Sequence, residues 1–423
     1  MDIVRRQGLG LFQYRPAHEI ILFNLQINNT APMKLIRNVQ VYAPNKLGKK
    51  DLLTGGGKIL AIADSLSLQG PEIEVVDMKG RIATPGLIDQ HIHLIGAGGK
   101  HGFNSLTPEI TLSELIACGS TTVMGLLGTD GITKSLRTLY AKTKALDREG
   151  ITAYMLTGFF GLPPITLTGS VLEDMILVDK VIGCKVAISD PRSSYPTAKE
   201  LLNILKDVHV GGLTSGKGGI LHVHLGSLDT NMSLLLELVE TYKFPIKNIS
   251  PTHVGRTASL FDEAIKFAKL GGMIDITTGG TKFSEPYEQV LYALSKGASI
   301  DNMTFSSDGN AGMARMNKDG EVVEFYKAPV DLNYKQVVKL IKKGRLPVSD
   351  AFKMVTSGPA KNLSLTNKGI IDLNKDADLC FFDNDFNLTD VMAMGNWMMK
   401  DGTVTKIGSF ETSLQDDEDD DDE

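Results

Sequence analysis

The chain has 423 residues, 42% hydrophobic and 22% charged, which is ordinary for a globular protein and gives room for one large domain and a smaller one. Its formal charge of −6 arises from residues 416–423, which are all acidic, so the rest of the chain carries a charge of +2. This balance argues against a nucleic-acid surface, and no apolar run reaches the roughly 18 residues that a membrane-spanning helix needs.

In chain order, the first segment is residues 1–32, an N-terminal extension to which we assign no fold. The segments 35–66 and 72–82 are typical of hairpin strands, with glycines at their turns. They predict the first part of a small β domain, residues 33–84.

From residue 85 onward, short apolar runs recur about every thirty residues. They lie at 91–94, 121–127, 151–158, 181–189, 219–226, 249–255, 272–280 and 303–310. The gaps contain stretches with apolar residues at three- and four-residue intervals, which is the pattern of amphipathic helices. Strands that alternate with helices at this period form parallel βαβ units, and eight of them close into a (β/α)8 TIM barrel, which we place at residues 85–364.

Two further segments, 369–383 and 391–407, are again typical of hairpin strands. We expect this second part, residues 365–411, to pair with the first part into one small β-sandwich domain built from both chain ends. Residues 412–423 form an acidic tail that we expect to be disordered, with the binding of a basic partner as the alternative.

The three cysteines, Cys118, Cys184 and Cys380, lie far apart and form no CxxC pair. This indicates free, buried thiols in a reducing compartment, and we therefore predict a cytoplasmic protein.

The run DQHIHL places His91 and His93 two residues apart at the end of the first barrel strand. Alternate residues of a strand point to the same face, so the two rings project together. Alone, such a pair is as easily two half-buried histidines. Further polar residues, however, occupy the predicted strand ends: Lys185 on the fourth, His222 and His224 on the fifth, His253 on the sixth and Asp308 on the eighth. Because barrel active sites form where the strands end, the pattern predicts a metal centre.

The residue types fit two divalent ions. His91 and His93 can hold one, and His224 and His253 the other, with a hydroxide between the ions as nucleophile. His222 lies further from the strand end, which favours a packed interior position.

Lys185 and Asp308 complete the predicted centre. Burial drives a lysine toward its neutral amine, which can react with carbon dioxide to form a carbamate that bridges both ions. The alternative for Lys185 is a salt bridge to Asp190. Asp308 can ligate one metal, take the proton of the attacking water and return it to the leaving amine.

With these features the sequence resembles the amidohydrolase superfamily, and more closely its isoaspartyl dipeptidases (β-aspartyl peptidases). The matching segments are PGLIDQHIHLIGAGG, GLLGTDGIT, MLTG, TGSV, VIGCKVAISD-x-RS, PTHVGR, GGMIDITT and SSDGN. The resemblance implies a homo-oligomeric enzyme that hydrolyses the amide between an isoaspartyl side-chain carbonyl and the next amino acid of a small dipeptide. It also implies two zinc ions on His91, His93, carboxylated Lys185, His224, His253 and Asp308.

The resemblance further implies the substrate-binding residues. Arg192 and Arg256 correspond to two arginines that face substrate carboxylates, with surface ion pairs as the alternative for each. The backbone around Gly98 and the hydroxyl of Thr129 correspond to positions near the substrate's amino end.

Three positions depart from the family pattern. Lys100 stands where a glutamate would bind the substrate's α-amino group, Phe160 where a tyrosine would polarise the scissile carbonyl, and Gly312 where a serine is expected. Two alternatives therefore stay open. One is an amidohydrolase for another amide, either a cyclic amide or an N-acyl amino acid, for which Lys100 would bind an acid. The other is a weakly active homologue with a binding role.

Overall fold

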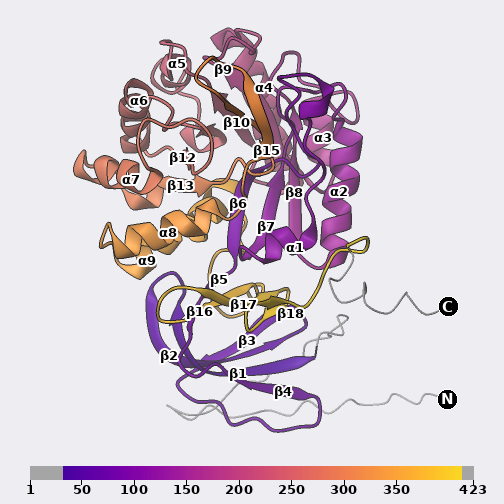
Figure 1. Ribbon diagram of the computed structural model, residues 1–423, viewed down its shortest axis with the longest axis vertical. Helices are drawn as coiled ribbons and strands as arrows, with labels where there is room; N and C mark the ends of the chain where they lie inside the picture. The colour runs from indigo at the N-terminus through magenta and orange to yellow at the C-terminus, as the bar shows by residue number, and fades with distance from the viewer. Residues whose placement is uncertain (1–31, 412–423) are drawn as a thin grey trace, which may run out of the picture.

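The computed structural model describes residues 32–411, which form a barrel with a smaller β domain below it in the view of Figure 1. The N-terminal extension up to residue 31 and the acidic tail from residue 412 lie outside the described residues.

Eight parallel strands form the barrel, and each pairs with its neighbour in chain order, as predicted. They are β6 (Leu87–Ile92), β7 (Ser120–Gly125), β8 (Thr152–Gly158), β9 (Val181–Ile188), β10 (Ile220–Leu225), β11 (Ile249–Thr252), β12 (Ile274–Thr277) and β13 (Met303–Ser306). The barrel approaches closure where the chain after β13 meets β6, through a bridge between Ile92 and Gly309. All eight strands are buried along their whole length except for Thr152 and Tyr154, which agrees with near-continuous apolar runs in a parallel sheet.

Helices follow the strands and pack on the outside of the barrel (Figure 1). They are α1 (Leu112–Ile116), α2 (Leu136–Glu149), α3 (Val171–Leu177), α4 (Ala198–Ser215), α5 (Ser233–Glu240), α6 (Ala258–Lys269), α7 (Pro286–Ser295), α8 (Leu332–Lys342), α9 (Val348–Lys353) and α10 (Ser357–Leu363). Helix α4 begins with a capping box between Thr197 and Glu200 and ends at Gly216 in the left-handed conformation. Because helices such as α6 bury one apolar face, a single large core joins them to the barrel strands.

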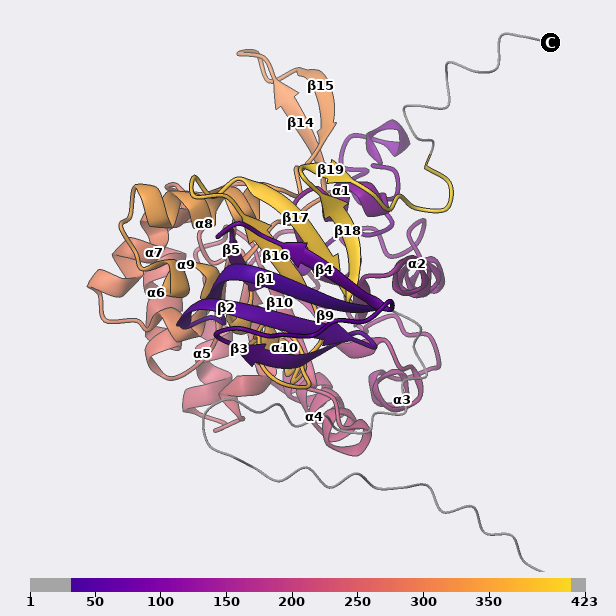
Figure 2. The ribbon, with the colours of Figure 1, turned by 90° about the horizontal axis from the view of Figure 1, so that it is seen from below.

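One nine-stranded sheet forms the small domain and contains strands from both chain ends (Figures 1 and 2). Its strands are β1 (Met33–Tyr42), β2 (Lys46–Gly55), β3 (Lys58–Ala63), β4 (Ile73–Asp77), β5 (Ile82–Pro85), β16 (Leu379–Phe382), β17 (Leu388–Ala393), β18 (Asn396–Lys400) and β19 (Thr403–Val404). The two ends meet where β5 pairs with β16. They also share one apolar core, to which Ile36 and Phe381 belong, so the predicted pairing of the ends is confirmed.

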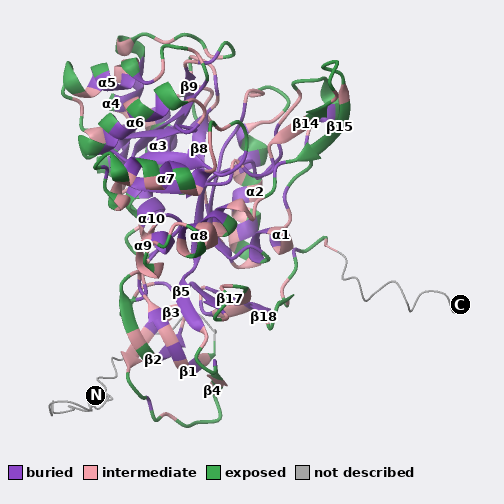
Figure 3. Cartoon of the chain, turned by 60° about the vertical axis from the view of Figure 1, so that its left-hand side comes forward, coloured by how far each residue is buried: buried purple, intermediate pink, exposed green. Residues whose placement is uncertain are grey.

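A two-stranded hairpin of β14 (Gly312–Met316) and β15 (Val322–Lys327) was not predicted from the sequence. It projects away from the barrel and is largely exposed (Figures 2 and 3). It begins at Gly312, which lines the candidate site described below.

The three cysteines are free and buried, as predicted. Among the helices of residues 32–411, none has both the length and the hydropathy required to cross a bilayer.

Candidate metal centre and substrate cavity

The six residues predicted to bind metal all line one cavity of about 50 Å³ at the carboxyl ends of the barrel strands. We call them the ligand set: His91, His93, Lys185, His224, His253 and Asp308. His91, Lys185 and His224 belong to β6, β9 and β10. The other three directly or closely follow β6, β11 and β13. The parallel arrangement therefore brings residues more than 200 positions apart to one rim.

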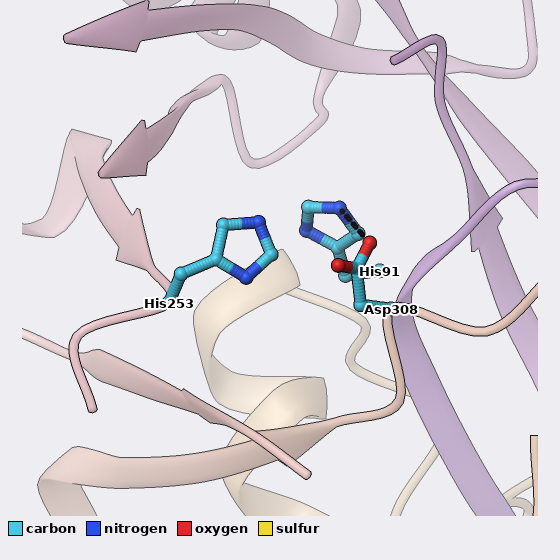
Figure 4. A group of neighbouring side chains, drawn as sticks. All are labelled: His91, His253 and Asp308. Atoms are coloured by element: carbon cyan, nitrogen blue, oxygen red, sulfur yellow. Dashed lines mark ion pairs between the residues drawn. The ribbon is translucent and has the colours of Figure 1, made fainter. Parts of the chain in front are cut away.

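Asp308 lies between the two histidines of the first strand. Its Oδ1 is 3.3 Å from His91 Nε2 and 3.2 Å from His93 Nε2. The ligand atoms of His91, His253 and Asp308 all lie within 4.8 Å of one another, and in Figure 4 the three side chains point toward a common centre. This spacing is compatible with one divalent cation among them.

The backbone is strained at two of these positions. His253 and Asp308 have φ values of 62° and 51°, in the left-handed region that non-glycine residues rarely adopt. The Asp308 N–H donates a hydrogen bond to the His91 carbonyl at 3.1 Å, and His253 Nδ1 lies 2.5 Å from Thr277 Oγ1. Such strain costs about 1–3 kcal/mol per residue and is typical of functional sites, where the surrounding contacts maintain it.

Three histidines of the ligand set, His91, His224 and His253, are buried, and their environment favours neutral rings. Burial, assisted by Lys185, lowers the pKa of His91 to about 3. Burial also lowers the pKa of His224 and of His253 well below the usual value. Neutral imidazoles keep a free lone pair, so these donors fit the nitrogen ligands of a borderline cation such as Zn²⁺.

Lys185 is fully buried, and its Nζ lies 3.3 Å from His91 Nε2. Burial lowers the pKa of Lys185 to about 7, against the opposing effect of Asp308. The alternative salt bridge to Asp190 is not found: Asp190 pairs instead with Arg192, at 2.6 Å, and with His224 Nε2, at 3.0 Å. A neutral amine in this position is the form that can react with carbon dioxide.

His222 is buried, as predicted, but it also contacts the centre, which the sequence analysis did not anticipate. Its Nε2 lies 2.9 Å from His91 Nδ1, and its Nδ1 lies 3.0 Å from Ser250 Oγ. Asn362 Nδ2 donates to the same Ser250 oxygen at 2.9 Å. The sequence offered one indication of this contact: His222 lies two residues before His224, on the same face of the strand.

Asp89 and Asp190 were also missed as residues of the site. Asp89 accepts hydrogen bonds from the backbone N–H of His91 and from both the N–H and the hydroxyl of Ser307, so it ties β6 to the segment that carries Asp308. Burial raises the pKa of Asp89 to about 7. Asp190 fixes His224 and Arg192 together. In the sequence, Asp89 could have been found from its place just before the H-x-H motif, and Asp190 from its D-x-R spacing to Arg192.

The four predicted substrate residues, Gly98, Thr129, Arg192 and Arg256, line the same cavity as the ligand set. Arg192 Nη1 lies 3.5 Å from Thr129 Oγ1. The side chain of Arg256 makes no hydrogen bond or ion pair with any described residue, and it is half-buried. Of the alternative ion pairs, Arg192 forms one with Asp190, whose carboxylate is buried, and none is found between Arg256 and a described residue.

The three residues that depart from the family pattern also line the cavity. The Phe160 ring is 4.2 Å from that of His224, centroid to centroid, and Arg192 Cζ lies 5.2 Å from its centre. A Cβ at Gly312 would lie only 2.8 Å from Gly98 Cα and 2.9 Å from the Ser105 carbonyl oxygen. A serine at position 312 therefore does not fit this backbone without movement.

A second, larger cavity of about 560 Å³ adjoins the first. Gly98, Lys100, Thr129 and Arg192 line both cavities. The wall of the second cavity also includes Phe103, Leu106 and Asp130. Its volume lies in the range of small-molecule sites.

Comparisons with known proteins agree with this geometry. The model of the amidohydrolase family matches residues 188–398. The beta-aspartyl dipeptidase of Fervidobacterium islandicum AW-1, solved in complex with beta-Asp-Leu dipeptide, is 39% identical, with a TM-score of 0.83 over 90% of this chain and 100% of that chain. A D-hydantoinase, at 18% identity, shares the fold with a TM-score of 0.63 over 90% of this chain and 98% of that chain.

Among curated proteins, the imidazolonepropionase of Streptococcus gordonii is 35% identical over 138 residues, which are 28% of this chain and 32% of that protein. The first curated relatives are thus matched over about a third of their length or less. The dihydroorotase of Lactobacillus leichmannii is 25% identical over 399 residues, 83% of this chain and 88% of that protein. The chain belongs to the amidohydrolase family, in the group of the beta-aspartyl dipeptidases.

Proposed function

We propose that the protein is a binuclear metal-dependent hydrolase that cleaves the β-aspartyl amide bond of dipeptides. The observation that carries this proposal is the convergence of the complete ligand set on one cavity that two arginines also line. The likeness to a dipeptidase solved with beta-Asp-Leu supports the same substrate class.

In this proposal His91 and His93 hold one cation, and His224 and His253 hold the other. Bound here, two divalent cations supply an activated water molecule and positive charge against the amide carbonyl. The neutral amine of Lys185 adds to carbon dioxide, which forms an N–C bond and releases one proton. The resulting carboxylate would be an anionic ligand for the two cations, and it would explain why a lysine is buried among histidines with no ion pair to a described acidic residue.

Asp308 serves as the general base and then the general acid. Its carboxylate lies beside His91 and His93, and its interactions with His253 and with those two histidines keep its pKa well below the usual value despite burial. The carboxylate takes a proton from water as the water oxygen bonds to the side-chain carbonyl carbon of the substrate. It then delivers that proton to the nitrogen of the leaving amino acid, so that aspartate and a free amino acid result.

Two arginines and two smaller groups hold the substrate. Arg256 forms no ion pair with any residue from 32 to 411, and Arg192 pairs with Asp190. Both line the cavity, so both are suited to bind substrate carboxylates. The Thr129 hydroxyl and the backbone around Gly98 lie where the substrate's amino end would approach.

A substrate panel tests the proposal. Protein loaded with Zn²⁺ is assayed with β-Asp-Leu, α-Asp-Leu, dihydroorotate and N-acetyl-leucine, with release of product measured by chromatography. We expect hydrolysis of β-Asp-Leu at least a hundredfold faster than of α-Asp-Leu, because only the β linkage sets the carbonyl and both carboxylates in register with the site. Faster turnover of dihydroorotate or N-acetyl-leucine would replace the proposal with an amidohydrolase for another amide. Binding of zinc without turnover of any compound would favour the non-catalytic homologue.

A further inference from the structure

The first cavity is too small for a whole dipeptide. Its volume of about 50 Å³ is far below the roughly 300–1,000 Å³ of pockets that enclose a small molecule. The remainder of any substrate must therefore extend into the adjoining cavity of about 560 Å³. The side chains of Lys100, Thr129 and Arg192 stand at the boundary between the two.

Three cationic side chains lie at or near this boundary. Lys100, Arg192 and Arg256 all line the first cavity. Lys100 donates no side-chain hydrogen bond and forms no ion pair with residues 32–411, although it lies close enough to Arg192 and Arg256 to be affected by their charges. Burial of part of its side chain and then the charge of Arg192 lower the pKa of Lys100, while Asp308 and Asp190 oppose this effect.

An ammonium ion, by contrast, finds no free acceptor there. Among the described residues that line the two cavities, the acidic side chains are Asp130 and Asp308. Asp130 accepts hydrogen bonds from the backbone N–H groups of Ile132 and Thr133 and from the Thr133 hydroxyl, and Asp308 belongs to the ligand set. A dipeptide with a free α-amine would bring a fourth positive charge to these three cations.

We infer that Lys100 selects a β-aspartyl amide whose α-nitrogen is acylated by an anionic group, with the acyl chain in the larger cavity and its carboxylate at Lys100. This inference rests on the proposed function, in which Gly98 and Thr129 lie at the substrate's amino end. Such a substrate carries three carboxylates and no ammonium, which matches the cationic side chains of Lys100, Arg192 and Arg256 in the wall of the first cavity. Its hydrolysis uses the same water and the same bond, and it yields an N-acyl aspartate and a free amino acid.

The test compares matched compounds on zinc-loaded protein. N-succinyl-β-Asp-Leu and its neutral isostere N-succinamoyl-β-Asp-Leu differ only in the charge of the acyl end. We expect kcat/KM to favour the succinyl compound at least tenfold in the native protein and less than threefold in Lys100→Met, with the order reversed in Lys100→Glu. Lys199→Glu, which changes an exposed lysine on α4, is the control for net charge and should keep the native ratio. Equilibrium binding of N-succinyl-aspartate and N-succinamoyl-aspartate, the two products, should follow the same order by calorimetry.

The ratio of kcat/KM between β-Asp-Glu and β-Asp-Gln shows whether the third carboxylate is bound at the leaving residue instead of at the acyl end. A larger ratio for this pair than for the succinyl pair would overturn the inference, because the anion would then belong to the leaving residue. A succinyl ratio within twofold of unity in the native protein, or an unchanged ratio in Lys100→Met, would also overturn it. If β-Asp-Leu is hydrolysed without such a preference, only this inference fails. If β-Asp-Leu and every acylated compound stay intact, the proposed function fails with it.

Discussion

The two ring nitrogens of His91 have different neighbours: Nδ1 lies beside His222 Nε2, and Nε2 faces Asp308. A His91 tautomer with its proton on Nδ1 donates to His222 Nε2 and leaves the lone pair of His91 Nε2 for a cation. We therefore expect His222→Phe, which keeps a ring of similar size, to lower zinc affinity by about ten- to a hundredfold. Competition with a fluorescent chelator measures this loss, while kcat at saturating zinc should fall much less than affinity does.

His209→Phe is the matched control, because His209 is half-buried on α4 and its side chain is hydrogen-bonded to Asn248, away from the ligand set. Its zinc affinity should equal that of the native protein. Equal affinity in His222→Phe as well would show that the contact with His91 is structural only.

The environment of Lys185 favours a neutral amine that can form a carbamate. It is fully buried beside His91 and 5.8 Å from the centre of the Phe160 ring, an environment that disfavours a charged ammonium. We expect native protein prepared in ¹³C-bicarbonate to show a carbamate carbon signal by NMR, and Lys185→Ala to lack the signal and to lose bound zinc and activity. Small carboxylic acids should partly restore both. Two bound zinc ions and full activity in untreated Lys185→Ala would rule out the bridge.

The ligand set could be predicted because it depends only on which residues stand at strand ends, and parallel strands share one end. The contacts that other side chains make with the ligand set could not be predicted. His222 meets His91 across the interior of the barrel, and Asp190 chooses Arg192 and His224 over Lys185, which are matters of side-chain direction between strands. Neither contact leaves a periodic signal in the sequence.

Among the elements, the eight barrel strands were predictable because each belongs to a short run that contains apolar residues and recurs about every thirty residues between helix-like stretches. The hairpin of β14 and β15 was missed because it packs on no core and so lacks an alternating buried face. Its one signal was the turn around Asp319-Gly320. The first half of the segment 369–383 was wrongly predicted as strand, since β16 begins only at Leu379 and the residues before it form turns.

The loop after β6 and the start of the hairpin approach each other backbone to backbone, at Gly98 and Gly312. We expect Gly312→Ser to push the two elements apart, because its Cβ would lie 2.8 Å from Gly98 Cα. The unfolding free energy should fall by about 1–3 kcal/mol, and KM for β-Asp-Leu should rise more than kcat falls. Urea unfolding and steady-state kinetics measure the two effects. Ala314→Ser, two residues further along β14, is the control and should change neither value. Unchanged KM in Gly312→Ser would mean that this contact does not shape the cavity.

At the scale of the whole molecule, Lys368 joins the barrel to the small sheet. Its Nζ donates to Thr152 Oγ1 of β8 at 2.6 Å and pairs with Asp378 at 2.6 Å and Asp376 at 2.9 Å, and it is almost fully buried. Burial alone would lower the pKa of Lys368, but Asp378 and Asp376 raise it above the usual value, so the pair network is charged at neutral pH.

We expect Lys368→Met to reduce the free energy of unfolding by about 3–5 kcal/mol, since it leaves the buried carboxylate of Asp378 without its cation, while Asp376 keeps its ion pair with Lys58. Lys375→Met is the control: its ammonium is exposed and bonds to the Thr366 carbonyl, so its effect should stay within about 0.5 kcal/mol. Guanidinium unfolding of both variants provides the comparison. A loss below 1 kcal/mol in Lys368→Met would show that the two parts are held together by apolar packing instead.

In the proposed reaction, two metal ions and the whole ligand set act together on a β-aspartyl amide. A titration of metal-free protein with Zn²⁺, in which the release of leucine from β-Asp-Leu is followed, tests this directly. We expect the rate to rise until two equivalents of zinc are bound per chain. We also expect Asp308→Asn to turn over at least a thousandfold more slowly when loaded with zinc, because its side chain cannot take the proton. A rate that saturates at one equivalent, or β-Asp-Leu left intact by protein with two bound zinc ions, would contradict it.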